Sequence, residues 1–532
     1  MNRPLDPLQI ASTRVRFVRT ERQASLIAPL GRREQLTILA LAGVLIALSI
    51  AVRKLNHDEG QYVAAIELAH FGWPYRDFAY LQTPLQPILL SPLAGLPAGW
   101  LLVGARIANG LFGLATVGLV MIALRRRASA RSTTMAIVLL LCSEPFLLAC
   151  SLARNDALPM AFLAGAIVAL LRGLDAHRPQ AHSAAAGLLL GLASSAKISA
   201  AIPAAAAGLF LLIRTRRSGL CPFAVFIGGV LLGLVPTLVL GLIAPDRFYF
   251  DVFAYNLDAP RQWWTAAGHA NWLDPQFRIL RLTVLSAQGC ILFGVAAAAI
   301  DRRRSDDRLL LDLMIIGGLI TAYMPEPAFT QYLVPLLAPV AVRLALAIDT
   351  FPDHWNRRLA FSTSGFCALG MLLTGYYAVR AYRQGDDLSY GVEQGRAVAL
   401  AAAGQSIVTL SPERVAGSDS KLERGFVTGP FLFRTSGRLS ERALRLGYSP
   451  NWQRIVQSLG ADKPSAILTG GESAPSGALF PDGLDARLVG WAATHRYRRV
   501  LLPGNAVLWL RPQPKLEVDR KLASYERANS RA

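Results

Sequence analysis

The sequence predicts a polytopic α-helical membrane protein with about eleven transmembrane helices, followed by a C-terminal extracytoplasmic α/β domain. Hydrophobic residues make up 53% of the 532 residues, which is far above their share in a soluble domain. Long apolar runs recur up to residue 380 and then stop. The formal net charge of +20 comes from short Lys and Arg clusters between these runs, a pattern typical of membrane topology and not of nucleic-acid binding.

Most of the predicted spans are single apolar runs of roughly 17 to 25 residues, the length that crosses the hydrocarbon core of a bilayer. They are residues 36–53, 99–124, 133–151, 157–172, 220–243, 279–300 and 359–379. Two longer runs are each expected to form a pair of spans. Residues 183–213 are broken at Lys197, and residues 309–349 are broken by the segment MPEPAFTQY.

The basic loops orient these spans, because Lys and Arg are enriched on the cytoplasmic side of a membrane. We expect residues 1–35 to be a cytoplasmic segment, and the first apolar run to be a retained anchor in the cell inner membrane. The loops expected on the same side are residues 125–131, 214–217, 301–308 and 353–358. An odd number of spans then leads to a periplasmic domain over residues 381–532, where the runs SIVTL, SAILTG and VLWLRP predict strands.

By elimination, the outer face holds the segments that are rich in carboxylates, aromatic rings and isolated cations. They are the DEG loop, the SLARND turn, Lys197, the loop over residues 244–277 and MPEPAFTQY. The aromatic residues of the 244–277 loop are typical of an interfacial belt, and sugar stacking is the alternative interpretation. We find no glycine-rich phosphate loop or nucleophile elbow, and the five cysteines lie in or beside apolar runs, so neither nucleotide hydrolysis nor disulfides are expected.

Asp58 and Glu59 are the first candidates for chemistry. If they begin a short helix, adjacent residues cannot share a face, so one carboxylate can accept a proton from a hydroxyl while the other orients a neighbour or a metal. The alternative is an acidic N-terminus that complements the helix dipole. Asp156 precedes the fourth span, where it is either an N-cap or a second acid in the same cavity, and together with Asp58 it could hold a divalent cation.

Four cations are candidates to balance these acids: Lys197, Arg154, Arg106 and Arg76. Arg106 lies inside the second span, where an unpaired guanidinium is costly, so it is expected to face protein, water or a phosphate. Lys197 can either snorkel or bind a phosphate at the headgroup level. Further candidate substrate contacts on the outer side are His57, Gln331 and Tyr332. The histidines lack partners at metal-ligand spacing, so a zinc site is not expected.

The loop DEGQYVAAIELAHFGWPYRDFAYLQTPLQPILLSPLAGL resembles the first outer loop of the GT-C superfamily of polyprenyl-phosphate-sugar glycosyltransferases. The nearest branch is similar to family 39, with the bacterial relatives of protein O-mannosyltransferases and aminoarabinose transferases. Over residues 36–380, further segments agree in order and topology: ARIANGLFGLATVGLVMIALRRR, ARNDALPMAFLAGAIVALL, GLLLGLASSAKISAAIP and PEPAFTQYLVPLLAPVAV.

The resemblance implies transfer of a sugar from a polyprenyl phosphate to a hydroxyl on the periplasmic face, usually with inversion. It leaves open a lipid, a glycan or a protein as the acceptor. Asp58, with Glu59 beside it, matches the catalytic base, and Asp156 matches a second acidic site. Lys197, Arg154, Arg106 and Arg76 become the candidates that hold the donor phosphate. The alternative function is a transporter or flippase of lipid-linked saccharides, although such proteins place polar sites near the bilayer midplane.

Overall fold

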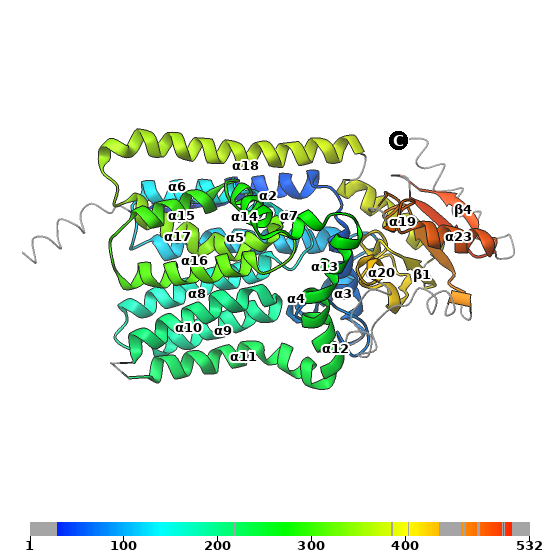
Figure 1. The fold of residues 1–532 in the computed structure, drawn as a ribbon, viewed down its shortest axis with the longest axis horizontal. Coiled ribbons are helices and arrows are strands. Elements are labelled where there is room, and N and C mark those ends of the chain that lie inside the picture. Colours follow the sequence, from blue (N-terminus) through cyan, green and yellow to red (C-terminus); the bar gives the residue numbers. More distant parts are fainter. Residues whose placement is uncertain are drawn as a thin grey trace, which may run out of the picture.

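The computed structural model describes residues 29–216, 219–384, 387–402, 404–435, 459–460, 463–475, 479–502, 504 and 506–512. A bundle of long helices forms most of the molecule, and a small sheet lies at one end of it (Figure 1). Most of the predicted cytoplasmic segment, up to residue 28, lies outside the described residues, and so does the end of the predicted C-terminal domain after residue 512.

The bundle confirms a polytopic helical membrane protein. Its unbroken helices are α2 (Arg32–Val52), α5 (Leu101–Leu124), α8 (Ala157–Asp175), α9 (Gln180–Ala196), α10 (Ala201–Thr215), α11 (Cys221–Ile243), α16 (Asp306–Tyr323), α17 (Leu337–Ile348) and α18 (Asn356–Gln384). Within the described residues, 7 helical segments are long and apolar enough to cross a membrane, or 9 if each of two bent pairs is one span.

This number is smaller than the predicted eleven because two helices of the bundle fall short of a typical span. Helix α9 has 17 residues, and α16 begins with Asp306, Asp307 and Arg308. Both nevertheless pack inside the bundle, α9 against α8 and α11, and α16 against α10. The break between α9 and α10 falls at Lys197, as predicted, where the backbone is extended.

Two runs that were predicted to be single spans are bent. Helices α6 (Ala130–Leu141) and α7 (Glu144–Ser151) meet at 62°, and α14 (Pro275–Ser286) and α15 (Cys290–Ile300) meet at 95°. Pro145 in the first turn of α7 has no backbone N–H, and Gly289 before α15 has φ +128. The Glu144 N–H donates to the Gln288 carbonyl at 3.0 Å. A backbone group freed at one bend thus finds its hydrogen-bond partner at the other bend.

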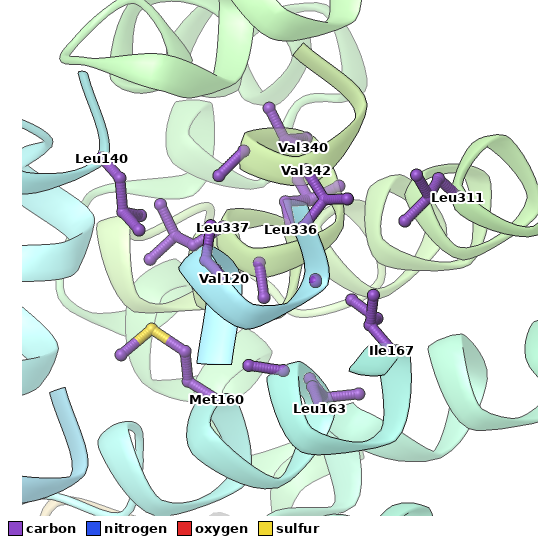
Figure 2. Packing of buried hydrophobic residues seen from close by; sticks show 14 of the residues in the cluster. Val120, Leu140, Met160, Leu163, Ile167, Leu311, Leu336, Leu337, Val340 and Val342 are labelled. Atoms are coloured by element: carbon purple, nitrogen blue, oxygen red, sulfur yellow. The ribbon is translucent and has the colours of Figure 1, made fainter. Parts of the chain in front are cut away.

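The core of the bundle surrounds α17, whose 12 residues are all buried. Figure 2 shows Val340 and Leu337 of α17 packed among Val120 of α5, Leu140 of α6 and Leu163 of α8. Helices in lipid associate through van der Waals packing and interhelical polar contacts, because lipid chains are as apolar as leucine. The enclosed position of α17 explains why all its faces are apolar apart from one arginine.

Helices α9 and α11 approach each other closely through two glycine pairs at i, i+4 spacing, Gly187 with Gly191 and Gly229 with Gly233. A Cβ atom at Gly191 would lie 2.3 Å from the Val230 carbonyl oxygen, so only glycine fits there. This contact holds the end of α9, from which Lys197 follows, in a defined place beside α11.

Three of the predicted basic loops lie together at the end of the bundle remote from the sheet. The Arg214–Asp306 ion pair, at 2.9 Å, joins two of these loops. Arg308 pairs with Asp301 within its own loop at 2.8 Å, and Arg127 pairs with Asp175 at the end of α8 at 2.8 Å. The opposite end carries α3 (His57–Leu68), α4 (Leu85–Leu90), α12 (Pro245–Tyr249) and α13 (Tyr255–Ala266), beside the sheet (Figure 1). Because basic loops mark one side of a membrane, the two ends are the two sides.

The C-terminal sheet domain, residues 404–512 as described, contains β1 (Ser406–Thr409), β2 (Lys421–Leu422), β3 (Ala466–Thr469), β4 (Arg498–Leu501) and β5 (Val507–Leu510). The strand order is β2-β1-β3-β5-β4, with β2, β1 and β3 parallel and β5 antiparallel to both β3 and β4. Helix α19 (Leu388–Ala402) and helix α23 (Ala486–Thr494) bury apolar residues in the same core as the sheet. The predicted strands correspond to β1, β3 and β5.

Candidate active site

Helix α3 begins beside the end of α2 nearer the sheet (Figure 1) and turns two adjacent carboxylates in different directions. Asn56 is its N-cap, and the Asn56 Oδ1 accepts the Asp58 N–H at 2.8 Å. The Asn56 N–H in turn donates to Glu59 Oε2 at 3.1 Å, which completes a capping box. The short helix predicted from the DEG loop is therefore present, and its first turn is defined by local hydrogen bonds.

Glu59 faces into the protein and is fully buried. Arg106 of α5 donates to both of its carboxylate oxygens, from Nε at 2.8 Å and from Nη2 at 2.7 Å, and the Ala153 N–H donates to Oε1 at 2.6 Å. The remaining Arg106 N–H groups donate to carbonyls at the end of α2. Both charges are thus paired and hydrogen-bonded, as buried ions must be. Arg106 faces protein, one of the three surroundings predicted for it.

Asp58 faces the opposite way, toward the cations of the bundle, and its side chain is 21% exposed. Arg154 Nη1 donates to Asp58 Oδ2, and His57 Nε2 lies 3.2 Å from Asp58 Oδ1. Burial raises the pKa of Asp58, but the charges and hydrogen bonds of Arg154 and His57 outweigh burial and hold that pKa well below its ordinary value. The Asp58 carboxylate is consequently ionised in this state.

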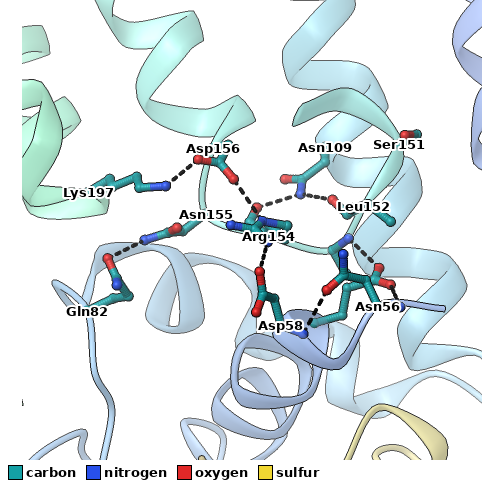
Figure 3. Close-up of polar contacts among 12 residues, drawn as sticks. Asn56, Asp58, Gln82, Asn109, Ser151, Leu152, Arg154, Asn155, Asp156 and Lys197 are labelled. Carbon is teal, nitrogen blue, oxygen red and sulfur yellow. Dashed lines mark hydrogen bonds and ion pairs between the residues drawn. The ribbon is translucent and has the colours of Figure 1, made fainter. Parts of the chain in front are cut away.

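Arg154 joins the two predicted acidic sites (Figure 3). Its Nε donates to Asp156 Oδ2 at 3.0 Å, while Lys197 Nζ donates to Asp156 Oδ1. Asp156 stands at the N-cap position of α8, yet its side chain makes no capping bond. Burial raises the pKa of Asp156, but the charges and hydrogen bonds of Lys197 and Arg154 lower that pKa by more than burial raises it. The net shift of the Asp156 pKa is therefore downward. Four residues predicted separately thus form one row: Asp58, Arg154, Asp156 and Lys197.

Polar side chains outside the predicted set of site residues hold the turn that carries Arg154. Asn109 Nδ2 donates to the Leu152 and Arg154 carbonyls, each at 2.6 Å, and Gln86 Nε2 donates to the Arg154 carbonyl at 2.8 Å. Asn155 Nδ2 donates to the Ala196 carbonyl at 3.1 Å, which ties the turn to the end of α9. Asn109 lies three residues after Arg106 in an apolar span. Because polar residues are rare inside such spans, the sequence could have marked Asn109 as a candidate.

The other predicted residues occupy different surroundings. Tyr332, in the 3-10 helix Thr330–Leu336, lies within electrostatic reach of Asp58 and Asp156, and Gln331 precedes it. Arg76 is exposed and pairs with its neighbour Asp77 at 2.8 Å. The structure thus groups Tyr332 with the row of charges and leaves Arg76 at the surface.

The donor set does not fit a metal ion at Asp58 and Asp156. Among the described residues, no group of three or more His, Cys, Asp and Glu side chains is arranged to hold one. The Arg154 guanidinium contacts both carboxylates, and Lys197 contacts Asp156, so two positive charges already face the two acids. We therefore derive no chemical step through a metal.

Residues 80–327 match the sequence model of glycosyltransferase family 87, where the resemblance pointed to family 39. The search of curated proteins gave no match. Two solved structures of ArnT from Cupriavidus metallidurans are similar at 14% identity, and each comparison covers 90% of this chain and 99% of the other chain. The TM-score is 0.56 for the apo state and 0.57 for the state bound to undecaprenyl phosphate. This likeness shows a common fold over nearly the whole of both chains, the GT-C fold that the sequence predicts.

Proposed function

We propose that this chain, a GT-C membrane glycosyltransferase with a segment that matches family 87, transfers a sugar from a polyprenyl phosphate to an acceptor hydroxyl with inversion. The reaction takes place at the periplasmic side of the inner membrane, where the C-terminal sheet domain also lies. The acceptor is a lipid, a glycan or a protein. One observation carries the proposal: at the end of the bundle opposite the basic loops, Arg154 joins Asp58 to Asp156, and Asp156 also pairs with Lys197.

The row of charges suits an anionic ligand at the membrane surface. A polyprenyl phosphate anchors its chain in lipid and presents its phosphate at the level of the helix ends. ArnT, which has the same fold, has been solved with undecaprenyl phosphate bound, and this supports the donor class. Arg154 and Lys197 are the cations that hold the donor phosphate, because both lie at the helix ends and both pair with Asp156.

Donor binding then frees the base. In the state described here, Arg154 is bound to Asp58, and a carboxylate with a strongly lowered pKa is a weak base. A donor phosphate competes with Asp58 for the same guanidinium. When Arg154 turns to the phosphate, Asp58 loses its strongest cationic partner and becomes a better proton acceptor. The enzyme is thereby poised to activate the acceptor only after the donor is in place.

The chemical step follows from these positions. The acceptor oxygen attacks the anomeric carbon of the sugar while the proton of the acceptor hydroxyl passes to Asp58. The bond between that carbon and the phosphate oxygen breaks, and its electron pair stays on the phosphate oxygen. The leaving phosphate gains charge, and Arg154 and Lys197 stabilise that charge more strongly than they stabilise the ground state. A single displacement of this kind inverts the anomeric configuration.

Glu59 and Arg106 support the site without touching the substrates. Their mutual hydrogen bonds leave neither group exposed, and Glu59 also holds the Ala153 N–H one residue before Arg154. We assign them a structural role in place of the catalytic and phosphate-binding roles that the sequence suggested. Tyr332, Gln331 and His57 stay candidate substrate contacts, and Arg76 is an outlying one.

The experiment that tests the function is transfer of radiolabel from a panel of polyprenyl-phosphate sugars to membrane acceptors by the purified protein. We expect label to move to an acceptor and polyprenyl phosphate to be released. If a folded protein moves no label from any donor, but carries labelled lipid-linked saccharide across the bilayer of a vesicle, the alternative of a transporter or flippase replaces this proposal.

Replacing Lys197 with Gln should weaken donor binding. The donor KM should rise by about 10- to 100-fold, the range that the loss of one charge-assisted hydrogen bond produces. Steady-state kinetics with a soluble short-chain polyprenyl-phosphate sugar measure this effect. Lys421→Gln, at an exposed position in β2, is the matched control. An unchanged donor KM in the Lys197 variant would remove this residue from the phosphate site.

Removal of divalent cations with a chelator tests whether Asp58 and Asp156 need a metal ion for the reaction. Because Arg154 bridges the two carboxylates, dialysis against a chelator should leave the transfer rate unchanged. The rate is measured before dialysis, after dialysis, and after addition of Mg²⁺ or Mn²⁺. Loss of transfer that either cation restores would show that turnover requires a divalent metal ion.

A further inference from the structure

We infer that the C-terminal sheet domain completes the active site, with Glu472 as a positioning residue that holds Asp58 through His57. The inference rests on the proposed function, since it gives the base of that reaction a second support. Nothing in the sequence pattern linked Glu472, which lies more than four hundred residues after Asp58, to the outer loop.

His57 lies between the bundle and the C-terminal sheet domain. Its Nε2 is 3.2 Å from Asp58 Oδ1, and its Nδ1 is 3.9 Å from Glu472 Oε1. Its ring meets the Phe431 ring edge-on, with centroids 5.8 Å apart. Asp58 therefore has one charged partner from the bundle, Arg154, and a second partner that the sheet domain holds in place.

Glu472 is itself fixed from within its domain, in the turn after β3. Its side chain is only 9% exposed, and Arg434 Nη2 donates to its Oε2 at 3.2 Å. Its backbone N–H donates to Asp485 Oδ2 at 2.9 Å, and the Gly470 N–H donates to the same oxygen at 2.8 Å. The carboxylate that faces His57 thus has a defined position before any substrate binds.

The sheet domain also contacts α3 at two further points, which fix the distance between Glu472 and His57. A Cβ atom at Gly60 would lie 2.7 Å from Glu413 Oε2, so the 3-10 helix Pro412–Arg414 packs directly on the first turn of α3. Near the end of α3, Glu67 Oε2 accepts the Gly417 N–H at 3.2 Å. The domain therefore lies along the whole helix that carries Asp58.

This arrangement matters at the moment when Arg154 turns to the donor phosphate. Asp58 then loses the partner of its Oδ2, and among the described residues the His57 contact to Oδ1 is the one left to limit its rotation. A base that is displaced by about 1 Å from a hydroxyl proton can cost up to about 100-fold in rate. Glu472 limits this displacement, because its carboxylate lies 3.9 Å from His57 Nδ1 and attracts the ring when the imidazole is protonated.

Replacing Glu472 with Gln tests the inference, because Gln keeps the size of the side chain and removes its charge. We expect kcat to fall by about 10- to 100-fold with the donor KM unchanged, and Glu472→Asp to recover part of the loss. Asp482→Asn, at an exposed position in the same domain, is the matched control. The apparent melting temperature in detergent reports whether each variant is folded. A wild-type kcat in folded Glu472→Gln overturns the inference.

A double-mutant cycle with His57→Gln separates positioning from a merely structural role. If Glu472 acts through His57, the double variant should be no slower than His57→Gln alone. Losses that multiply, or a wild-type kcat in His57→Gln, contradict the inference. His57 is 45% exposed, so its replacement is not expected to disturb folding. Failure of the wild-type protein to transfer any sugar would instead refute the proposed function, before any variant is compared.

Discussion

Replacing Asp58 with Asn is expected to lower kcat by about 100- to 10,000-fold, which is the usual contribution of a general base. Asn preserves the shape of the side chain but cannot accept the proton of the acceptor hydroxyl. The donor KM should stay constant or fall, because Arg154 no longer has to leave a carboxylate before it binds the phosphate. Transfer of radiolabel and a donor-binding isotherm, measured on the same preparation, separate these two quantities.

Asp246→Asn is the control for this variant, since Asp246 is an exposed acid in the neighbouring α12. Its transfer rate should equal that of the wild-type protein. If Asp58→Asn kept full activity while folded, the assignment of the base would be wrong, and Asp156 would be the next acid to test. If it lost donor binding together with turnover, Asp58 would organise the phosphate site and not act as the base.

Replacing Arg106 with Met is expected to destabilise the protein by about 3 to 5 kcal/mol, because it leaves the Glu59 charge buried without its partner. The loss should appear as a large fall in the apparent melting temperature in detergent and in the yield of folded protein. Any folded fraction should bind the donor normally, since Arg106 is enclosed by Glu59 and by backbone carbonyls.

The comparison that isolates charge from packing is the double variant Glu59→Leu with Arg106→Leu. Replacing both members of a buried ion pair by apolar residues costs less than removing one. The double variant should therefore be more stable than Arg106→Met, although the Ala153 and Asn56 N–H groups lose their acceptor. An Arg106→Met protein that is as stable as the wild type but has a raised donor KM would restore Arg106 to the phosphate site.

Much of the fold follows from local pattern. Apolar runs of spanning length gave the helices of the bundle, and the extended break at Lys197 lies where a charge interrupts such a run. The two sharp bends could not be predicted from the runs that contain them, because the Ser143 and Gly289 regions satisfy each other only after the helices pack. Strand β4 was also missed, since its Arg498 and Arg499 lie at the exposed edge of the sheet and break the apolar pattern.

The members of the candidate site were predictable as a set of residues but not as a set of contacts. Asp58, Asp156 and Lys197 stood out because a charge beside an apolar run is costly unless it is used. The sequence did not indicate that Arg154 contacts both acids, or that Glu59 and Arg106 neutralise each other away from the row. Glu472 gave no signal, because a glutamate in a soluble domain is normally a solvated surface residue.

The sequence by itself determined that this protein crosses the membrane many times and that its basic loops gather on one side, and it predicted that the candidate site lies on the other. Those properties depend on the hydrophobicity and charge of each segment, which do not change with the way the segments pack. Only the tertiary structure decided which of two adjacent carboxylates is available for chemistry. That choice depends on where the bundle places the Arg106 and Arg154 guanidinium groups around α3, and no property of the DEG loop alone contains this information.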